Sequence, residues 1–274
     1  MEMCPETQLD ERTLEEYERL IGEITNNPIF VRNRLMKLHH SLWDSRATLS
    51  GKYIAFEGID GSGKTVQKDL AVRYLKSRGV SVYSSDEPKT GEEAASGPYT
   101  YSGWTRDVLD KKFSVEKDKI PSLFAVSRAQ QHWLDLLVPR LSIGQHALYS
   151  RSVFSNLAYQ GNNERIMRRE VTMAWMYKTK LLPDIVIFVD VEPQVAMNRI
   201  ESRGTPQTLY EKLGKLTDTR NGFLELAKIN WREQVPPDLV FDTNREIKWI
   251  VVDGNKSVED VHEQIRTRVL EGII

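Results

Sequence analysis

The chain has 274 residues, of which 40% are hydrophobic and 28% are charged, a composition typical of a folded globular protein and not of a disordered or fibrous one. Its 38 Lys and Arg residues balance 39 Asp and Glu residues, so a net charge of -1 gives no general attraction to nucleic acid or to an anionic membrane. The single cysteine, Cys4, excludes an intramolecular disulfide and a multi-thiolate metal site, which favours a reducing, cytoplasmic setting.

Residues 1–50 are predicted to form a polar helical extension. Apolar side chains recur at helical spacing among glutamates over 14–24, and a second helix can begin at Asn27 and Pro28. The first ten residues lack the apolar core of a secretory signal. Because amphipathic helices mostly serve packing, we expect the extension to pack on the rest of the chain or on a second subunit, with a partner-binding arm as the alternative.

Over residues 51–274, short apolar runs alternate with helical segments. Strands are predicted at 53–56, 80–84, 146–149, 185–191 and 247–252. Helices are predicted at 64–77, 122–141, 164–182, 193–202, 209–231 and 258–270. This alternation predicts an α/β fold, with a five-stranded parallel sheet and helices on both faces. The richest apolar stretch, 181–191, contains Asp184 and Asp190 and is too short to span a bilayer.

A phosphate-binding loop follows the first predicted strand and precedes a helix. It fits the pattern G-x-x-x-x-G-K-[ST] and reads Gly58-Ile59-Asp60-Gly61-Ser62-Gly63-Lys64-Thr65. Its glycines let backbone N–H groups face phosphate oxygens, and the helix N-terminus adds a favourable dipole. We expect Lys64 to reach the β- and γ-phosphates and Thr65 to ligate Mg²⁺. Such a P-loop is shared by ATPases, GTPases, kinases and switches, so the rest of the chain must decide among them.

A series of segments then resembles the thymidylate kinase family of P-loop nucleoside monophosphate kinases, over residues 52–273. The segments are Phe56-Glu57 with the loop and Gln67, Glu87-Pro88, Leu123-Phe124-Ala125 with Arg128-Ala129-Gln130, Arg151 with Ser155 and Leu157-Ala158-Tyr159-Gln160-Gly161, and Pro183-Asp184-Ile185 with Asp190, Arg199 and Arg203-Gly204. The guanine-reading motif N-K-x-D of GTPases is missing, because Ser257-Val258 follows Asn255-Lys256. The resemblance implies ATP- and Mg²⁺-dependent transfer of the γ-phosphoryl group to dTMP, giving dTDP, by a homodimer.

Several side chains receive roles from this resemblance. Arg151 directly follows a predicted strand, at the ligand-binding edge of the sheet, and is expected to bridge the donor and acceptor phosphates. Phe124 and Arg128 are four residues apart and share a helix face, where a ring can stack on thymine while a guanidinium reads its edge. Further contacts are implied for Asp60, Tyr159 and Gln160 with the acceptor nucleoside, and for Arg199 and Arg203 with ATP.

The sequence departs from the family pattern at Ser150 and Ser127, each in place of Asp, at Ser152 in place of Tyr, and at Asp86 in place of Arg. Loss of the carboxylate at 150 weakens the expected hold on Mg²⁺. Asp86 is expected to repel an anionic acceptor unless Lys89 compensates. The five histidines lack metal-ligand spacing and receive no chemical role.

Glu87 keeps two alternatives open. It can organise magnesium or hold the acceptor, or it can belong to an ordinary Asp86-Glu87-Pro88 turn. Together with Arg151 it also resembles the deoxynucleoside kinases, in which Glu87 would be the general base for a 5′-hydroxyl. A kinase-like regulator that binds nucleotide with little catalysis is a further alternative. The longer contiguous match favours the monophosphate as acceptor.

Overall fold

The computed structural model describes residues 49–89, 100–112, 114–161, 164–204, 208–231 and 246–274, with a few single positions before residue 49. The helices predicted within residues 1–50 lie almost wholly outside the described residues. The boundary between that extension and the domain therefore stays a prediction.

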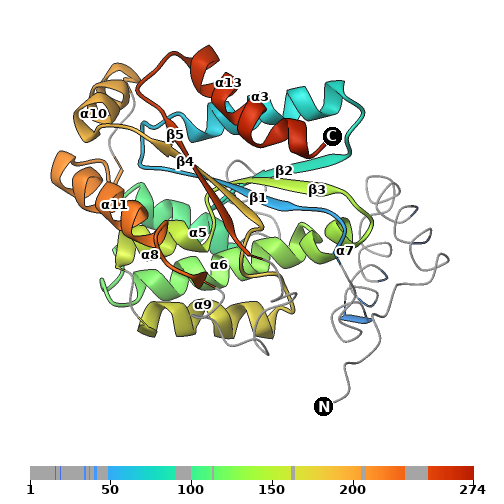
Figure 1. The fold of residues 1–274 in the computed structure, drawn as a ribbon. Helices are drawn as coiled ribbons and strands as arrows, with labels where there is room; N and C mark the ends of the chain where they lie inside the picture. The colour runs from blue at the N-terminus through green and yellow to red at the C-terminus, as the bar shows by residue number, and fades with distance from the viewer. Residues whose placement is uncertain are drawn as a thin grey trace.

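The core of the molecule is a five-stranded sheet in the order β2-β3-β1-β4-β5 (Figure 1). All neighbouring strands are parallel, which confirms the fold class predicted from the sequence. The strands are β1 (Tyr53–Glu57), β2 (Val82–Asp86), β3 (His146–Ser150), β4 (Ile185–Asp190) and β5 (Lys248–Asp253).

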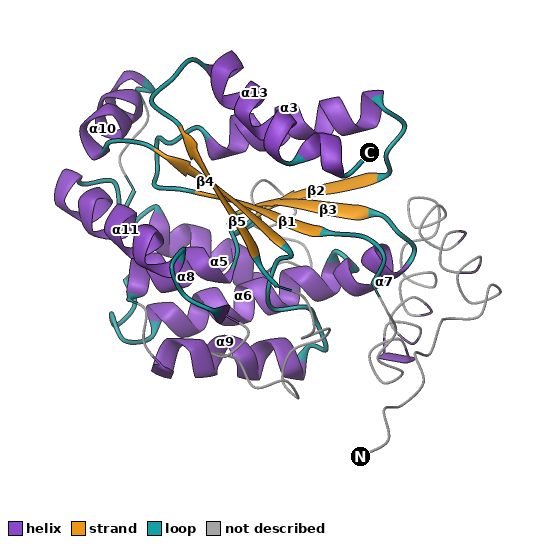
Figure 2. Cartoon of the chain, in the orientation of Figure 1, coloured by secondary structure: helices purple, strands orange, loops and turns teal. Residues whose placement is uncertain are grey.

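Helices connect the strands, as Figure 2 shows. They are α3 (Lys64–Ser77), α5 (Thr100–Leu109), α6 (Ile120–Leu134), α7 (Leu137–Ser142), α8 (Val153–Gln160), α9 (Glu164–Met176), α10 (Pro193–Ser202), α11 (Leu213–Leu226) and α13 (Val258–Arg268), followed by a 3₁₀ turn, η2 (Leu270–Gly272). The single helix predicted over 122–141 is two helices, because Leu136 adopts a left-handed backbone with φ 56°. The sequence analysis missed α5 and α8, and it extended α9 and α11 too far.

Helices cover both faces of the sheet (Figure 1). Alternation along the strands builds this arrangement, since successive side chains point to opposite faces. In β4, Ile187 packs into one core with α3 and α13, whereas Val186 and Phe188 pack into another with α8 and α11. Among the described residues, no helix is long and apolar enough to cross a membrane.

The carboxyl ends of β1, β2 and β3 lie side by side and carry the chemistry. The phosphate-binding loop follows β1, Glu87 and a cis Pro88 follow β2, and Arg151 follows β3. The chain crosses from one side of β1 to the other between β3 and β4, and ligands of α/β sheets bind at such a reversal. The topology therefore places one site at this edge.

Candidate active site

A cavity of about 920 Å³ opens at the carboxyl edge of the sheet. It is large enough for a small-molecule ligand site. Most residues singled out from the sequence line it, namely Asp60, Gly61, Ser62, Gly63, Lys64, Thr65, Glu87, Phe124, Arg128, Arg151, Tyr159, Gln160, Arg199 and Arg203. The fold thus brings together side chains that are spread over most of the domain sequence.

Gly58 and Ile59, which the motif assigned to ATP binding, do not line this cavity. Ile59 is 1% exposed and belongs to the core. Gly58 has φ 152°, and a Cβ there would lie 2.6 Å from Ser62 Oγ and 2.8 Å from the Val189 carbonyl oxygen. These two residues therefore support the conformation of the loop. Ile59 anchors it in the core, and Gly58 is needed because only glycine fits the close approach at residue 58.

Lys64 sits at the base of the cavity with its side chain almost fully buried. Its Nζ donates to the Ile59 carbonyl oxygen at 3.2 Å and lies 3.6 Å from an Asp60 carboxylate oxygen. Burial and the nearby charge of Arg151 lower the pKa of Lys64 to about 8. Burial favours the neutral amine and a second cation adds repulsion, so a bound anion would relieve both penalties.

Arg151 leaves β3 with a left-handed backbone, φ 75°. This conformation costs a non-glycine residue roughly 1–2 kcal/mol and is typical of functional sites. Its guanidinium pairs with Asp60, which also accepts a hydrogen bond from the Tyr159 hydroxyl at 3.2 Å. Burial would raise the pKa of Asp60, but the charges of Arg151 and Lys64 outweigh that effect and lower it to about 2. Asp60 therefore stays anionic and holds both cations at the loop.

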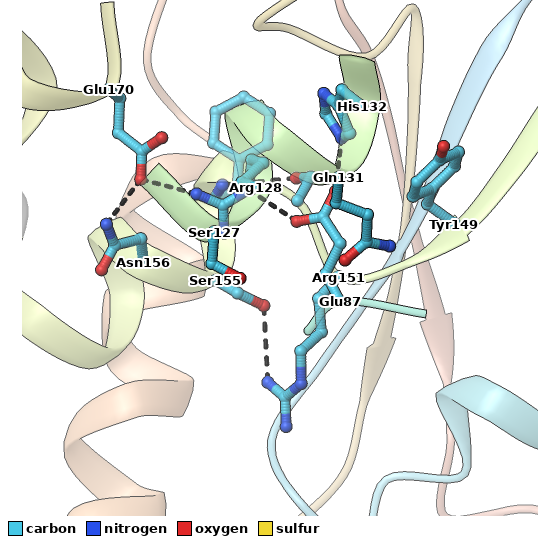
Figure 3. Close-up of polar contacts among 12 residues, drawn as sticks. Glu87, Ser127, Arg128, Gln131, His132, Tyr149, Arg151, Ser155, Asn156 and Glu170 are labelled. Atoms are coloured by element: carbon cyan, nitrogen blue, oxygen red, sulfur yellow. Dashed lines mark hydrogen bonds and ion pairs between the residues drawn. The ribbon is translucent and has the colours of Figure 1, made fainter. Parts of the chain in front are cut away.

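Glu57, the last residue of β1, is fully buried behind Arg151. It accepts hydrogen bonds from the hydroxyls of Ser152 and Ser155, each at 2.6 Å. Arg151 Nη1 in turn donates to Ser155 Oγ at 3.4 Å (Figure 3). Burial raises the pKa of Glu57. Ser152, one of the departures from the family pattern, thus satisfies a buried carboxyl group.

Arg128 lies between two buried carboxylates (Figure 3). Its Nε donates to Glu87 and its Nη1 donates to Glu170, both at 2.6 Å. Burial would lower the pKa of Arg128, but the carboxylates of Glu170 and Glu87 raise it above its ordinary value. The guanidinium is therefore permanently charged and fixed from two directions.

Glu87 has both oxygens engaged. One accepts from Arg128, and the other lies 2.5 Å from His132 Nε2. His132 is 1% exposed and its Nδ1 lies 3.2 Å from the Lys180 carbonyl oxygen. No histidine received a role from the sequence. His132 nevertheless has one, because it helps to hold Glu87. Because Glu87 lies 45 residues away from His132 along the chain, no local pattern in the sequence identifies this contact.

The predicted ATP end of the cavity is lined by Arg199 and Arg203. Arg199 Nη2 donates to the Gly254 carbonyl oxygen at 3.1 Å, and Arg203 pairs with Glu211 at 2.7 Å. Residues 205–207 of the loop beyond Arg203 lie outside the described residues. Gln160 Nε2 donates to the Tyr210 hydroxyl at 2.5 Å, so it links α8 to the residues before α11.

Asp86 lines the cavity and is paired with a lysine. Lys68, one turn beyond the loop, donates to Asp86 Oδ1 at 2.9 Å. Lys89, the compensating cation predicted from the sequence, instead places its amine 3.5 Å from Asp135. Lys68 therefore offsets the charge expected to repel an acceptor, because opposite charges at this distance largely neutralise each other's field.

Two residues in the cavity were missed by the sequence analysis. Arg106 on α5 has a buried Nε with no partner among the described residues, and burial and the charge of Arg151 lower its pKa. Asn156 on α8 is 2% exposed, and its Oδ1 has no partner within the described part of the chain. Asn156 lies between Ser155 and Leu157, two residues that carry the family resemblance, and this was a usable signal, whereas Arg106, between Thr105 and Asp107, had none.

Comparisons with known proteins agree with this geometry. The thymidylate kinase family model matches residues 56–235. The chain is 31% identical to a thymidylate kinase of Thermosipho africanus over 219 residues, which cover 79% of this chain and 96% of the relative. It is 32% identical to a thymidylate kinase of Pelobacter propionicus over 231 residues, which cover 81% of this chain and 94% of that protein. With its P-loop, its buried arginines and this extent of similarity, the chain belongs to the thymidylate kinase family.

Proposed function

We propose that the chain transfers the γ-phosphoryl group of ATP to dTMP and so forms dTDP. The observation that carries this proposal is the acceptor end of the cavity, where Arg128 and Asn156 stand beside Phe124. Nη2 of Arg128 takes part in neither of its two ion pairs and is a donor, and Oδ1 of Asn156 is a buried acceptor without a partner among the described residues. Thymine offers an acceptor at O4 and a donor at N3, which matches this pair.

The state of Glu87 favours the monophosphate over a nucleoside as acceptor. A 5′-hydroxyl needs a general base with a carboxylate oxygen directed at it. Both oxygens of Glu87 are instead occupied, by Arg128 and by His132. A monophosphate oxygen is already anionic at pH 7 and needs positive charge, which Arg151 and Arg106 supply at the same cavity. We therefore assign Glu87 to holding the base-reading arginine and not to proton transfer.

Catalysis in this proposal is positioning and charge neutralisation. Lys64 and the loop N–H groups hold the β- and γ-phosphates, and Arg199 and Arg203 hold the rest of ATP. Arg151 leaves Asp60 on binding and spans the donor and acceptor phosphates, where it offsets charge on the transferred group. The γ-phosphoryl group passes directly to the acceptor oxygen, so the P–O bond to ADP breaks as the bond to dTMP forms.

Magnesium fits the wall of the cavity at Thr65. The Thr65 hydroxyl lies 3.2 Å from Ser150 Oγ, which stands at the end of β3. Because Mg²⁺ keeps several waters and binds substrate phosphates, few of its ligands come from the protein, and the Thr65 hydroxyl would be one of them. When bound, the ion neutralises charge on the β- and γ-phosphates. Asp86, the register partner of Ser150 on β2, also lines the cavity, but its carboxylate is paired with Lys68.

Arg106→Gln is expected to raise KM for dTMP roughly 10- to 100-fold, the range of one charged hydrogen bond, with little change in KM for ATP. Arg106 lines the cavity and has an unpartnered buried Nε among the described residues, so an acceptor phosphate would meet it. Steady-state kinetics with each substrate varied measure the effect. Arg165→Gln, 70% exposed on α9, is the matched control. Unchanged KM for dTMP would remove Arg106 from the acceptor site.

The function is tested by offering ATP and Mg²⁺ with dTMP, thymidine, dCMP, dAMP and dGMP in separate reactions and measuring ADP and phosphorylated product. We expect conversion of dTMP to dTDP. Conversion of thymidine without dTMP would establish the nucleoside kinase alternative. Tight ATP binding without phosphoryl transfer to any acceptor would instead support the regulator.

A homodimer in the cytoplasm completes the proposal. Exposed apolar side chains support the dimer, because large ones mark contact surfaces. Trp104 on α5 is 53% exposed, and Trp175 and Met176 on α9 are 57% and 59% exposed. Both helices pack against α6 on the same side of the sheet (Figure 1). Sedimentation equilibrium should give twice the 31.6-kDa chain mass.

A further inference from the structure

Glu170 contacts both Arg128 and Asn156, the two side chains that the proposed function places at the base. Its Oε1 accepts from Arg128 Nη1 at 2.6 Å and from Asn156 Nδ2 at 2.5 Å (Figure 3). The residue is 2% exposed and comes from α9, an element to which the sequence assigned no chemistry. One buried oxygen atom therefore joins two side chains from two other helices.

These contacts determine which way the Asn156 amide points. Nδ2 faces Glu170 and also donates to the Pro121 carbonyl oxygen at 3.1 Å. Both neighbouring atoms are acceptors only, so the amide nitrogen must point toward them. Oδ1 is then left as the group without a partner among the described residues, in a residue that lines the cavity.

The same carboxylate also determines which donors Arg128 presents. Glu87 takes Nε and Glu170 takes Nη1, which fixes the plane of the guanidinium. Nη2 takes part in neither ion pair. The base therefore meets a donor from Arg128 and an acceptor from Asn156, in an order that Glu170 enforces on both.

We infer that Glu170 is a positioning residue that makes the site select a 4-oxo pyrimidine over a 4-amino pyrimidine. This inference rests on the proposed function. Thymine places an acceptor at position 4 and a donor at N3, whereas cytosine places a donor at position 4 and an acceptor at N3. Cytosine would set donor against donor and acceptor against acceptor, and a site built from buried polar groups rejects such a ligand strongly.

Glu170→Met tests this role, because methionine has a similar length and no strong hydrogen-bond acceptor. It leaves Arg128 paired one-to-one with Glu87, so no buried carboxylate loses its cation. We expect the ratio of kcat/KM for dTMP over dCMP to fall roughly 10- to 100-fold, the range for losing a fixed polar partner. The loss should lie in KM for dTMP, with kcat at saturating dTMP changed little.

Conservative substitution separates positioning from packing. Glu170→Gln retains an oxygen that can accept from both Arg128 and Asn156, so it should restore most of the preference for dTMP. Glu164→Met, 77% exposed at the start of the same helix, is the matched control and should change nothing. If Glu170→Met fails to fold, Glu170→Asp keeps the charge but withdraws the oxygen by one methylene, and we expect a smaller fall in the same ratio.

Calorimetric binding of dTMP, dCMP and ATP gives a readout that does not need turnover. Glu170→Met should weaken dTMP binding and leave ATP binding intact, which also shows that the domain is folded. If wild-type protein prefers dTMP and the Met and Asp variants keep that preference, the inference is wrong. If wild-type protein neither binds nor phosphorylates dTMP, the proposed function is what fails.

Discussion

Lys64→Ala is expected to lower kcat/KM for ATP roughly a thousandfold or more, because it removes the one side-chain cation that the phosphate-binding loop supplies. The side chain is buried at the base of the cavity, and its Nζ is 3.6 Å from Asp60. Loss of its charge also leaves Asp60 to face the incoming phosphates with Arg151 as its counter-ion. Initial rates at saturating dTMP, with ATP varied, measure the effect.

Two comparisons keep this result specific to the site. Lys76→Ala, exposed in the last turn of the same helix, should leave the kinetics unchanged. The thermal midpoint of Lys64→Ala should stay close to that of the wild type. Burial destabilises the charged amine of Lys64, so its removal costs the folded state little. Activity within tenfold of the wild type would show that the backbone N–H groups of the loop hold ATP without Lys64.

Arg128→Met is expected to destabilise the protein by about 3–5 kcal/mol, besides raising KM for dTMP and weakening the choice of base. The base-reading role that the resemblance implies for Arg128 accounts only for the kinetic effect. In the structure the guanidinium is shared by Glu87 and Glu170, whose side chains are 3% and 2% exposed. Removing it leaves two buried carboxylates without their cation. For a domain of this size, the loss corresponds to a thermal midpoint lowered by roughly 6–20 °C.

The source of that instability can be tested with a second substitution. Arg128→Met combined with Glu170→Gln removes one of the two uncompensated charges, so it should recover part of the lost stability. Arg168→Met, 77% exposed on α9, controls for the loss of a surface arginine and should change the midpoint little. A full loss of stability that the double variant does not lessen would show that packing, and not charge, is what Arg128 contributes.

The fold and the donor half of the site could be predicted from the sequence because their signals are contiguous. The alternation of apolar runs with helical segments predicts the parallel sheet, and eight consecutive residues specify a loop for phosphate. Arg151 was also predictable, since it directly follows a strand whose end had to face the ligand. In each of these cases the pattern that identifies the residue lies next to it in the chain, even where its partner in the site lies far away.

The acceptor half was decided by the tertiary structure. Arg128 meets Glu87 across 41 residues and Glu170 across 42, and Arg151 meets Asp60 across 91. Glu170 stands beside Arg168 and Arg169 in the sequence, where it resembles a solvated charge. Burial decides which of many charged side chains pair, because removal from water makes an unpaired charge costly and forces each buried carboxylate onto a specific cation. That choice depends on how α6, α8 and α9 pack, and no local pattern in the sequence encodes it.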